Sequence, residues 1–99
     1  MNVRWTDWAL EQIEAIEAFV ARDNAVAAER LVERIFDKGE TLAQHPRRGR
    51  VVAEVGRSDV RELAFGNYRI IYVVRSDRVD VLTVLERHRR LVPADTGDL

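Results

Sequence analysis

The chain of 99 residues is long enough for one folded domain and too short for two. Its hydrophobic fraction of 46% is ordinary for a globular protein, whereas its charged fraction of 33% exceeds the usual quarter or so. The sequence contains no cysteine, which excludes a disulfide scaffold, a cysteine-ligated metal centre and a thiol nucleophile. We expect a single domain over residues 1–99 and a cytoplasmic location, with no signal peptide and no membrane-spanning segment.

The net charge of −1 hides an uneven distribution of arginine. Of the 16 basic residues, 15 are arginine, and residues 47–90 carry 11 of them against six acidic residues. A compositional bias of the genome explains much of this excess, but arginine is also preferred for bidentate contacts to phosphates and carboxylates. The acidic pI of about 6.1 argues against charge-driven binding of nucleic acid, so we expect no high-affinity DNA binding by the chain alone.

The first half of the chain predicts a short strand followed by two helices. Asn2–Trp5 alternates polar and apolar residues, and Thr6 is a suitable N-cap for an amphipathic helix over residues 7–22. After a tight connection, a second amphipathic helix is predicted over Ala25–Gln44. Gly39 disfavours the helix by about 1 kcal/mol, which indicates either a kink or a close approach of helix and sheet.

The second half predicts a loop, three strands and a tail. An irregular, glycine-punctuated stretch covers residues 45–58, and Val51–Val55 within it forms a short strand or lies extended over the core. Three apolar segments separated by two-residue turns read as successive antiparallel strands, namely Val60–Phe65, Tyr68–Arg75 and Val79–Leu85. The acidic residues 92–99 are expected to form a flexible tail.

These elements predict an α+β fold with the order β-α-α-β-β-β. A helical hairpin packs on one face of a mostly antiparallel sheet, and the first strand joins an edge. The last two strands are apolar on both faces, which is typical of strands that are covered on both sides. The face away from the helices must therefore be covered by the tail or by a partner.

Few residues are suited to catalysis. His45 and His88 lie far apart in the sequence, and we expect no metal and no cofactor. Glu86 and His88 are two residues apart at the end of the last strand, so they share a face and form either an acid–base pair or an ordinary surface pair. The sequence contains no phosphate-binding loop, dinucleotide fingerprint or nucleophile elbow.

Arginines near the strand ends are the remaining candidates. Arg69 lies in the middle of a predicted strand, where it either binds a phosphate or a partner's carboxylate, or forms an internal ion pair with Glu62 or Glu86. The arginines nearer the strand ends are mostly solvated in the simplest interpretation.

The sequence resembles the RelE/ParE toxin superfamily of bacterial type II toxin–antitoxin systems. The resemblance covers residues 3–91 and depends on motifs in a fixed order, namely Pro46-Arg47-Arg48-Gly49-Arg50, Val60-Arg61-Glu62-Leu63, Tyr68-Arg69-Ile70-Ile71-Tyr72, Val79–Val84 and Glu86-Arg87-His88-Arg89. It implies the same α+β fold.

The ParE-like branch resembles this chain best. It implies a non-enzymatic toxin that inhibits growth by binding DNA gyrase, and a ParD-like antitoxin whose C-terminal segment wraps the toxin. That segment would cover the second face of the sheet and place acidic residues against the arginines. The candidates for partner contacts are Arg61, Arg69, Arg75, Arg87 and Arg89.

The RelE-like branch is the alternative, and it implies a ribosome-dependent mRNA endoribonuclease. Cleavage of RNA needs a base, an acid and cations around the phosphate, and the catalytic candidates are then Arg69, Arg87, His88 and Arg89. Glu62 stands where that branch favours a basic residue and would repel a phosphate, which favours the ParE-like interpretation. A third hypothesis is a toxin fold that has lost its toxicity and serves only in a complex.

Overall fold

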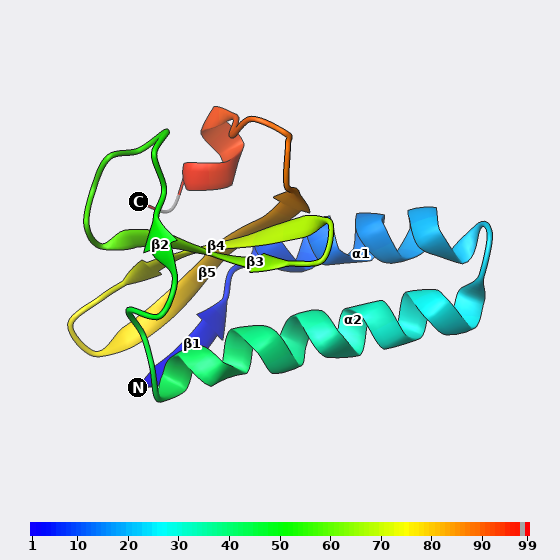
Figure 1. Ribbon diagram of the computed structural model, residues 1–99, viewed down its shortest axis with the longest axis horizontal. Coiled ribbons are helices and arrows are strands. Elements are labelled where there is room, and N and C mark those ends of the chain that lie inside the picture. Colours follow the sequence, from blue (N-terminus) through cyan, green and yellow to red (C-terminus); the bar gives the residue numbers. More distant parts are fainter. Residues whose placement is uncertain (98) are drawn as a thin grey trace.

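The computed structural model describes residues 1–97 and residue 99 (Figure 1). The elements, in chain order, are β1 (Asn2–Trp5), α1 (Asp7–Ala21), α2 (Ala25–Glu40), the 3-10 turn η1 (Thr41–Ala43), β2 (Arg50–Val51), β3 (Val60–Phe65), β4 (Tyr68–Val74), β5 (Arg78–Glu86) and the 3-10 turn η2 (Pro93–Thr96). The predicted order is confirmed, and of the two alternatives for Val51–Val55 the structure shows a short strand, β2, which covers only Arg50–Val51.

The five strands form one sheet in the order β1-β5-β4-β3-β2. β1 pairs in parallel with β5 at one edge, and all other pairs are antiparallel. The two helices form a hairpin on one face of this sheet, and their connection extends beyond it (Figure 1). The predicted α+β architecture and the edge position of the first strand are therefore confirmed.

Both helices begin where a polar side chain caps them. Thr6 Oγ1 accepts a hydrogen bond from the Ala9 amide at 3.1 Å, and Asn24 Oδ1 accepts one from the Ala27 amide at 3.0 Å. The Thr6 hydroxyl also donates to the Leu82 carbonyl at 3.1 Å, which ties the start of α1 to the central strand β5. The second helix ends at Glu40 and continues only as the 3-10 turn η1, so it is shorter than predicted.

A β-bulge in β5 decides which residues face the helices. Ile71 pairs with Thr83 and Tyr72 pairs with Val81, so Leu82 has no counterpart on β4. The bulge shifts the alternation by one residue, which brings Val84 to the same face as Val81. Leu82 packs in the cluster on the opposite face.

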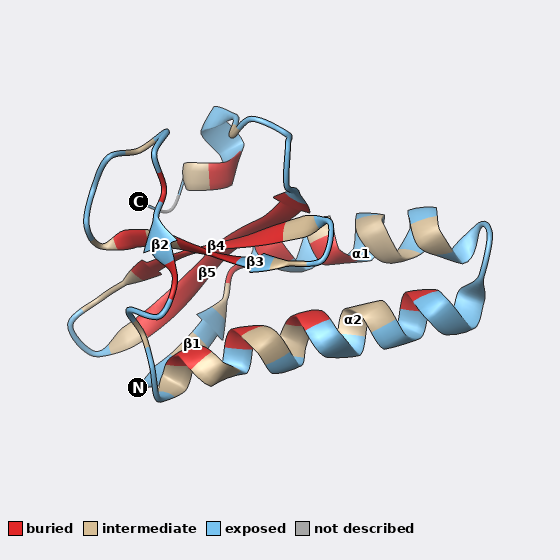
Figure 2. Ribbon diagram, in the orientation of Figure 1, coloured by how far each residue is buried: buried red, intermediate tan, exposed pale blue. Residues whose placement is uncertain are grey.

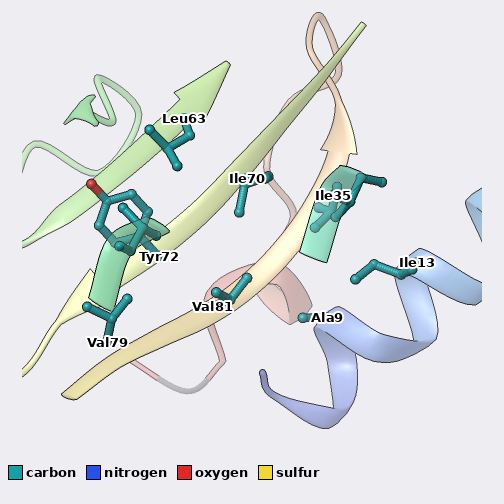
Figure 3. Close-up of a cluster of buried hydrophobic side chains, with 10 residues drawn as sticks. Ala9, Ile13, Ile35, Leu63, Ile70, Tyr72, Val79 and Val81 are labelled. Atoms are coloured by element: carbon teal, nitrogen blue, oxygen red, sulfur yellow. The ribbon is translucent and has the colours of Figure 1, made fainter. Parts of the chain in front are cut away.

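The face of the sheet toward the helices holds the larger of two apolar clusters (Figure 3). Ala9 and Ile13 of α1 and Ile35 of α2 meet side chains of the central strands there, and all are buried (Figure 2). Gly39 lies against the indole of Trp5, where a methyl group would collide with the ring. The predicted close approach of helix and sheet is thus present, and it explains a glycine inside α2.

The opposite face of the sheet is covered by the chain itself. Its cluster is at most 1% exposed and comprises Val52, Val60, Ile71, Val73, Leu82 and Leu85. Val55 of the loop after β2 and Leu91 of the C-terminal segment pack against this cluster. The sequence left open whether the tail or a partner covers this face, and the structure shows that the chain's own loop and C-terminal segment do. The expectation that an antitoxin covers it is wrong.

A buried carboxylate fastens the C-terminal segment. Asp95 in η2 is 1% exposed, and its Oδ1 accepts hydrogen bonds from Trp8 Nε1 at 2.9 Å and Thr83 Oγ1 at 3.2 Å. Its Oδ2 accepts the Val92 amide at 2.8 Å. The docked segment therefore differs from the predicted flexible tail, because Asp95 finds donors that lie far away in the sequence. Residue 98 of that predicted tail lies outside the described residues.

We expect Asp95→Ala to lower the free energy of unfolding by about 1–3 kcal/mol, because Trp8 Nε1 and the Thr83 hydroxyl would lose their buried acceptor. Urea denaturation followed by tryptophan fluorescence measures this change. The control is Asp77→Ala, since that aspartate is exposed in the β4–β5 turn and its loss should change stability by no more than about 0.5 kcal/mol. Equal stability of the two variants would contradict the role given to Asp95.

Candidate functional site

Arg69 lies in the middle of β4, and its side chain is 10% exposed. Its two terminal nitrogens bind the Glu54 carboxylate as a fork, with Nη1 to Oε1 at 2.7 Å and Nη2 to Oε2 at 3.1 Å. Nη1 also donates to Glu62 Oε2 at 3.2 Å. We call these three residues the Arg69 clasp. It places a nearly buried cation between the buried carboxylate of Glu62 and the more exposed carboxylate of Glu54.

The Arg69 clasp joins segments that are far apart in the sequence. Arg69 Nη2 donates to the carbonyl of Arg89 at 2.7 Å, and Glu54 Oε2 accepts the amide of Leu91 at 3.0 Å. Glu62 Oε1 accepts from Arg50 Nε at 3.2 Å. The clasp therefore connects β2, the loop after it, β3, β4 and the segment that follows β5.

The charges of the clasp stabilise one another. The hydrogen bond from Arg69, followed by the one from the Leu91 amide, lowers the pKa of Glu54. The hydrogen bond to Glu54 raises the pKa of Arg69, although burial opposes that shift. The internal ion pair that the sequence offered as one interpretation of Arg69 is present. Its partners are Glu62 and Glu54, whereas Glu86 takes no part in it.

The segment after β5 forms an exposed turn over Arg87–Arg90, which we call the arginine turn. Its backbone is fixed by three contacts besides those of the clasp. The Arg87 amide donates to the Asn67 carbonyl at 2.8 Å, the Arg89 amide to the Glu86 carbonyl at 3.0 Å, and the His88 amide to Glu86 Oε2 at 3.2 Å. Within residues 1–97 and 99, the guanidinium groups of Arg87 and Arg89 make no hydrogen bond or ion pair. The turn thus presents free cations on an ordered backbone.

The prediction that Glu86 and His88 share one face of the last strand is wrong. β5 ends at Glu86, so His88 lies in the turn and no longer alternates with the strand. The contact between the two residues runs through the His88 amide and leaves the imidazole ring uninvolved. The pair therefore lacks the geometry for acid–base catalysis.

Arg61 and Arg75 have structural partners. Arg61 donates from Nε to the Ser58 carbonyl and from Nη1 to the Gly49 carbonyl, both at 2.9 Å. Arg75 Nε donates to Asp80 Oδ2 at 3.1 Å, and the fully buried Asp80 also accepts from Arg78 Nε at 2.8 Å. Of the five candidates for partner contacts, Arg87 and Arg89 are the two exposed residues.

Asp80 stays ionised in its buried position. Burial raises the pKa of its carboxyl group, but the hydrogen bonds from Arg78 and Arg75 and the nearby Arg4 more than offset this, and the pKa is lowered overall. Because Arg4 lies on β1, this cluster helps fasten the parallel edge strand to β5.

The arginine-rich loop before β2 is shaped by a contact that the sequence analysis missed. The Gly49 amide donates to the hydroxyl of Tyr72 at 2.8 Å. A side chain at Gly49 would collide with that hydroxyl and with the Glu62 carbonyl. The contact fixes the loop against the sheet and leaves Arg48 exposed. This contact joins a glycine to an aromatic hydroxyl 23 residues away, and only that long-range pairing could have indicated it in the sequence.

Within the described part of the chain, no group of three histidine, aspartate or glutamate side chains is placed to hold a metal ion. No helix there is long and apolar enough to cross a membrane.

The comparisons with known proteins assign this chain of two helices and a five-stranded sheet to a family. Residues 3–91 match the family model described as the ParE toxin of the type II toxin–antitoxin system parDE. The chain belongs to the ParE toxin family. As a member of this family, the chain is a toxin component of a type II toxin–antitoxin system.

Known proteins support this assignment. The chain is 36% identical over 91 residues to the Sinorhizobium fredii protein named "Putative toxin Y4kP", covering 90% of this chain and 91% of that one. Its fold is similar to a chain of a chromosomal ParDE system from P. aeruginosa, with a TM-score of 0.72, 20% identity and coverage of 87% and 95% of the two chains. The RelBE2 toxin–antitoxin complex of Mycobacterium tuberculosis gives a TM-score of 0.65 at 19% identity, covering 87% and 96%. The fold therefore occurs in both branches.

We expect Glu54→Gln to make the free energy of unfolding depend less steeply on pH in the acid range. Because the pKa of Glu54 in the folded chain lies below its ordinary value of 4.5, its contribution is fully present above that pH and is lost as the pH falls through the lowered pKa. The difference in free energy of unfolding between wild type and variant should therefore shrink below pH 4.5. Urea denaturation at a series of pH values measures it.

The matched control is Glu33→Gln, which removes an exposed carboxylate of α2 that has no contact with Arg69. The same pH-dependent difference in both variants would contradict a specific role of the Arg69 clasp.

Proposed function

We propose that this ParE-family toxin inhibits DNA gyrase by binding it, without catalysing a reaction, in the bacterial cytoplasm. The observation that carries the proposal is the state of Arg69, the cation that an RNA-cleaving toxin would need at the scissile phosphate. Its guanidinium is held by two carboxylates and is nearly buried. A site of this kind supports a structural role for Arg69 and leaves the exposed arginines for contacts with a protein.

The same geometry weighs against the RelE-like alternative. Cleavage of RNA needs a general base at the 2′-hydroxyl, an acid at the leaving oxygen and cations around the phosphate. Glu54 and Glu62 would repel a phosphate that approached Arg69. His88 has no side-chain hydrogen bond within residues 1–97 and 99 to hold its ring in a defined orientation.

A ParD-like antitoxin is the proposed second partner. The two solved structures with a similar fold are a ParDE system and a RelBE2 toxin–antitoxin complex, according to their titles. Arg87 and Arg89 are exposed, and carboxylates of either partner could bind them as charge-assisted hydrogen bonds. The chain's own loop and C-terminal segment cover the second face of its sheet, so we expect neutralisation to act on another surface.

The test is a supercoiling and DNA-cleavage assay with purified gyrase. We expect the wild-type chain to inhibit supercoiling and to increase cleaved DNA. The double variant Arg87→Ala/Arg89→Ala should inhibit at least about tenfold more weakly, because partner carboxylates lose two free cations. Arg57→Ala is the control, since Arg57 already pairs with Asp59 on the surface. Gyrase that is unaffected by excess toxin would refute the proposal.

Pulse labelling after induction distinguishes the alternatives in cells. Early loss of thymidine incorporation with continued methionine incorporation supports gyrase as the target. Early loss of translation, with mRNA cut in the ribosomal A site and the cuts abolished in Arg69→Ala, would establish the ribonuclease. Growth without any defect, combined with tight antitoxin binding, would establish a toxin fold without toxicity.

A further inference from the structure

Three arginines gather where the chain enters the sheet. Arg47 and Arg48 are exposed in the loop of residues 45–49, which we call the arginine loop. Arg61 lies in β3 beside this loop, and its Nε donates to the Ser58 carbonyl at 2.9 Å. Arg47 Nη1 donates to the same carbonyl at 3.4 Å, so the two guanidinium groups lie side by side. A depression of about 480 Å³ opens next to them, and it is lined by His45, Pro46, Arg47 and Arg48.

The positive charge of these three arginines is not neutralised within the described chain. The acceptors of Arg47 and Arg61 are backbone carbonyls, and the Arg48 side chain makes no hydrogen bond or ion pair with any of residues 1–97 and 99. The nearby hydroxyl of Tyr72 adds no negative charge, because burial raises its pKa more than the neighbouring amide and guanidinium groups lower it. The three side chains therefore form a surface suited to an anion.

The backbone of the arginine loop is fixed in place. The Arg48 amide donates to the His45 carbonyl at 3.1 Å and closes a turn. The Gly49 amide donates to the Tyr72 hydroxyl at 2.8 Å, and Arg61 Nη1 donates to the Gly49 carbonyl at 2.9 Å. The cations are thus presented on an ordered backbone, which reduces the entropy lost on binding.

The phosphates of a nucleic-acid duplex match this surface. They form a row of anions along each strand, and arginine binds them by paired hydrogen bonds. An unpaired base would need an aromatic side chain to stack on, but the arginine loop contains no phenylalanine, tyrosine or tryptophan, and Tyr72 is fully buried. The surface therefore favours the backbone of a duplex over single-stranded RNA.

The proposed target supplies such a duplex, because gyrase holds DNA while it works. Arg61 and Phe65 are four residues apart on β3, about 13 Å, and the turn after Phe65 fixes the arginine turn through the Asn67 carbonyl. One toxin molecule can thus contact protein through the arginine turn and DNA through the arginine loop. Two or three phosphate contacts bind weakly by themselves, but they contribute fully once gyrase holds both the toxin and the DNA.

We infer that the arginine loop and Arg61 bind phosphates of the duplex DNA held by gyrase, so that the toxin recognises the enzyme–DNA complex in preference to the free enzyme. This inference rests on the proposed gyrase target. It gives the arginine motif of residues 46–50 a role that is separate from that of the arginine turn.

The test uses Arg47→Ala/Arg48→Ala, with Arg30→Ala/Arg34→Ala as the matched control. All four arginines are exposed, and each double variant removes two positive charges. Of the four side chains, only Arg47 has a hydrogen bond among the described residues, at 3.4 Å, so both variants should fold, which thermal unfolding verifies. Fluorescently labelled toxin is titrated with gyrase alone and with gyrase bound to a linear DNA duplex.

We expect DNA to tighten the binding of wild-type toxin to gyrase at least about tenfold, because phosphate contacts are added. Arg47→Ala/Arg48→Ala should bind free gyrase like wild type and lose most of that gain, whereas Arg30→Ala/Arg34→Ala should keep it. For the gyrase–DNA complex, the loss of two phosphate contacts should also reduce the slope of log binding constant against log salt concentration by about 1.8.

Equal affinity of wild-type toxin for gyrase and for gyrase–DNA overturns the inference and leaves the proposed function intact. The same holds if Arg47→Ala/Arg48→Ala retains the gain, or if it weakens binding to free gyrase, which would assign the loop to a protein contact. Ribosome binding that only this variant loses would assign the loop to RNA and also overturn the inference. A wild-type toxin that binds gyrase in neither form refutes the proposed target itself.

Discussion

The fork of two hydrogen bonds between Arg69 and Glu54 is the interaction on which the arrangement of this molecule depends. It connects the loop after β2 to the middle of the sheet, and through the Arg89 carbonyl and the Leu91 amide it fixes the segment after β5. Removing Glu62 would leave the nearly buried Arg69 with one carboxylate fewer, at a larger cost than the loss of a surface ion pair. The clasp thereby combines a structural role with the presentation of the arginine turn.

The arginines of the second half of the chain fall into two groups once the structure is known. Arg61, Arg69 and Arg75 bind carbonyls or carboxylates of the chain itself. Arg87 and Arg89 extend from a turn whose backbone the first group helps to hold. A chain with a net charge near zero can therefore present a local excess of positive charge. That division is the basis on which we propose a protein target in place of RNA cleavage.

The two faces of the sheet are closed by different means. The helices cover one face by ordinary apolar packing (Figure 2). On the other face, the buried carboxylate of Asp95 holds the C-terminal segment over the apolar cluster. With both faces closed, the most exposed large apolar side chains among the described residues are Phe19 and Val26, on the two helices.

The sequence by itself determined the order of the main elements, the Thr6 cap that begins the first helix and the resemblance to the superfamily. These properties are local, because periodicity, caps and turns act over a few residues of the backbone. The tertiary structure alone decided that Glu54 binds Arg69, that Asp95 is buried beneath Trp8, and that a bulge at Leu82 shifts the faces of β5. Those outcomes join residues up to 87 positions apart, and no local pattern states which distant donor will meet a given carboxylate when the chain folds back on itself.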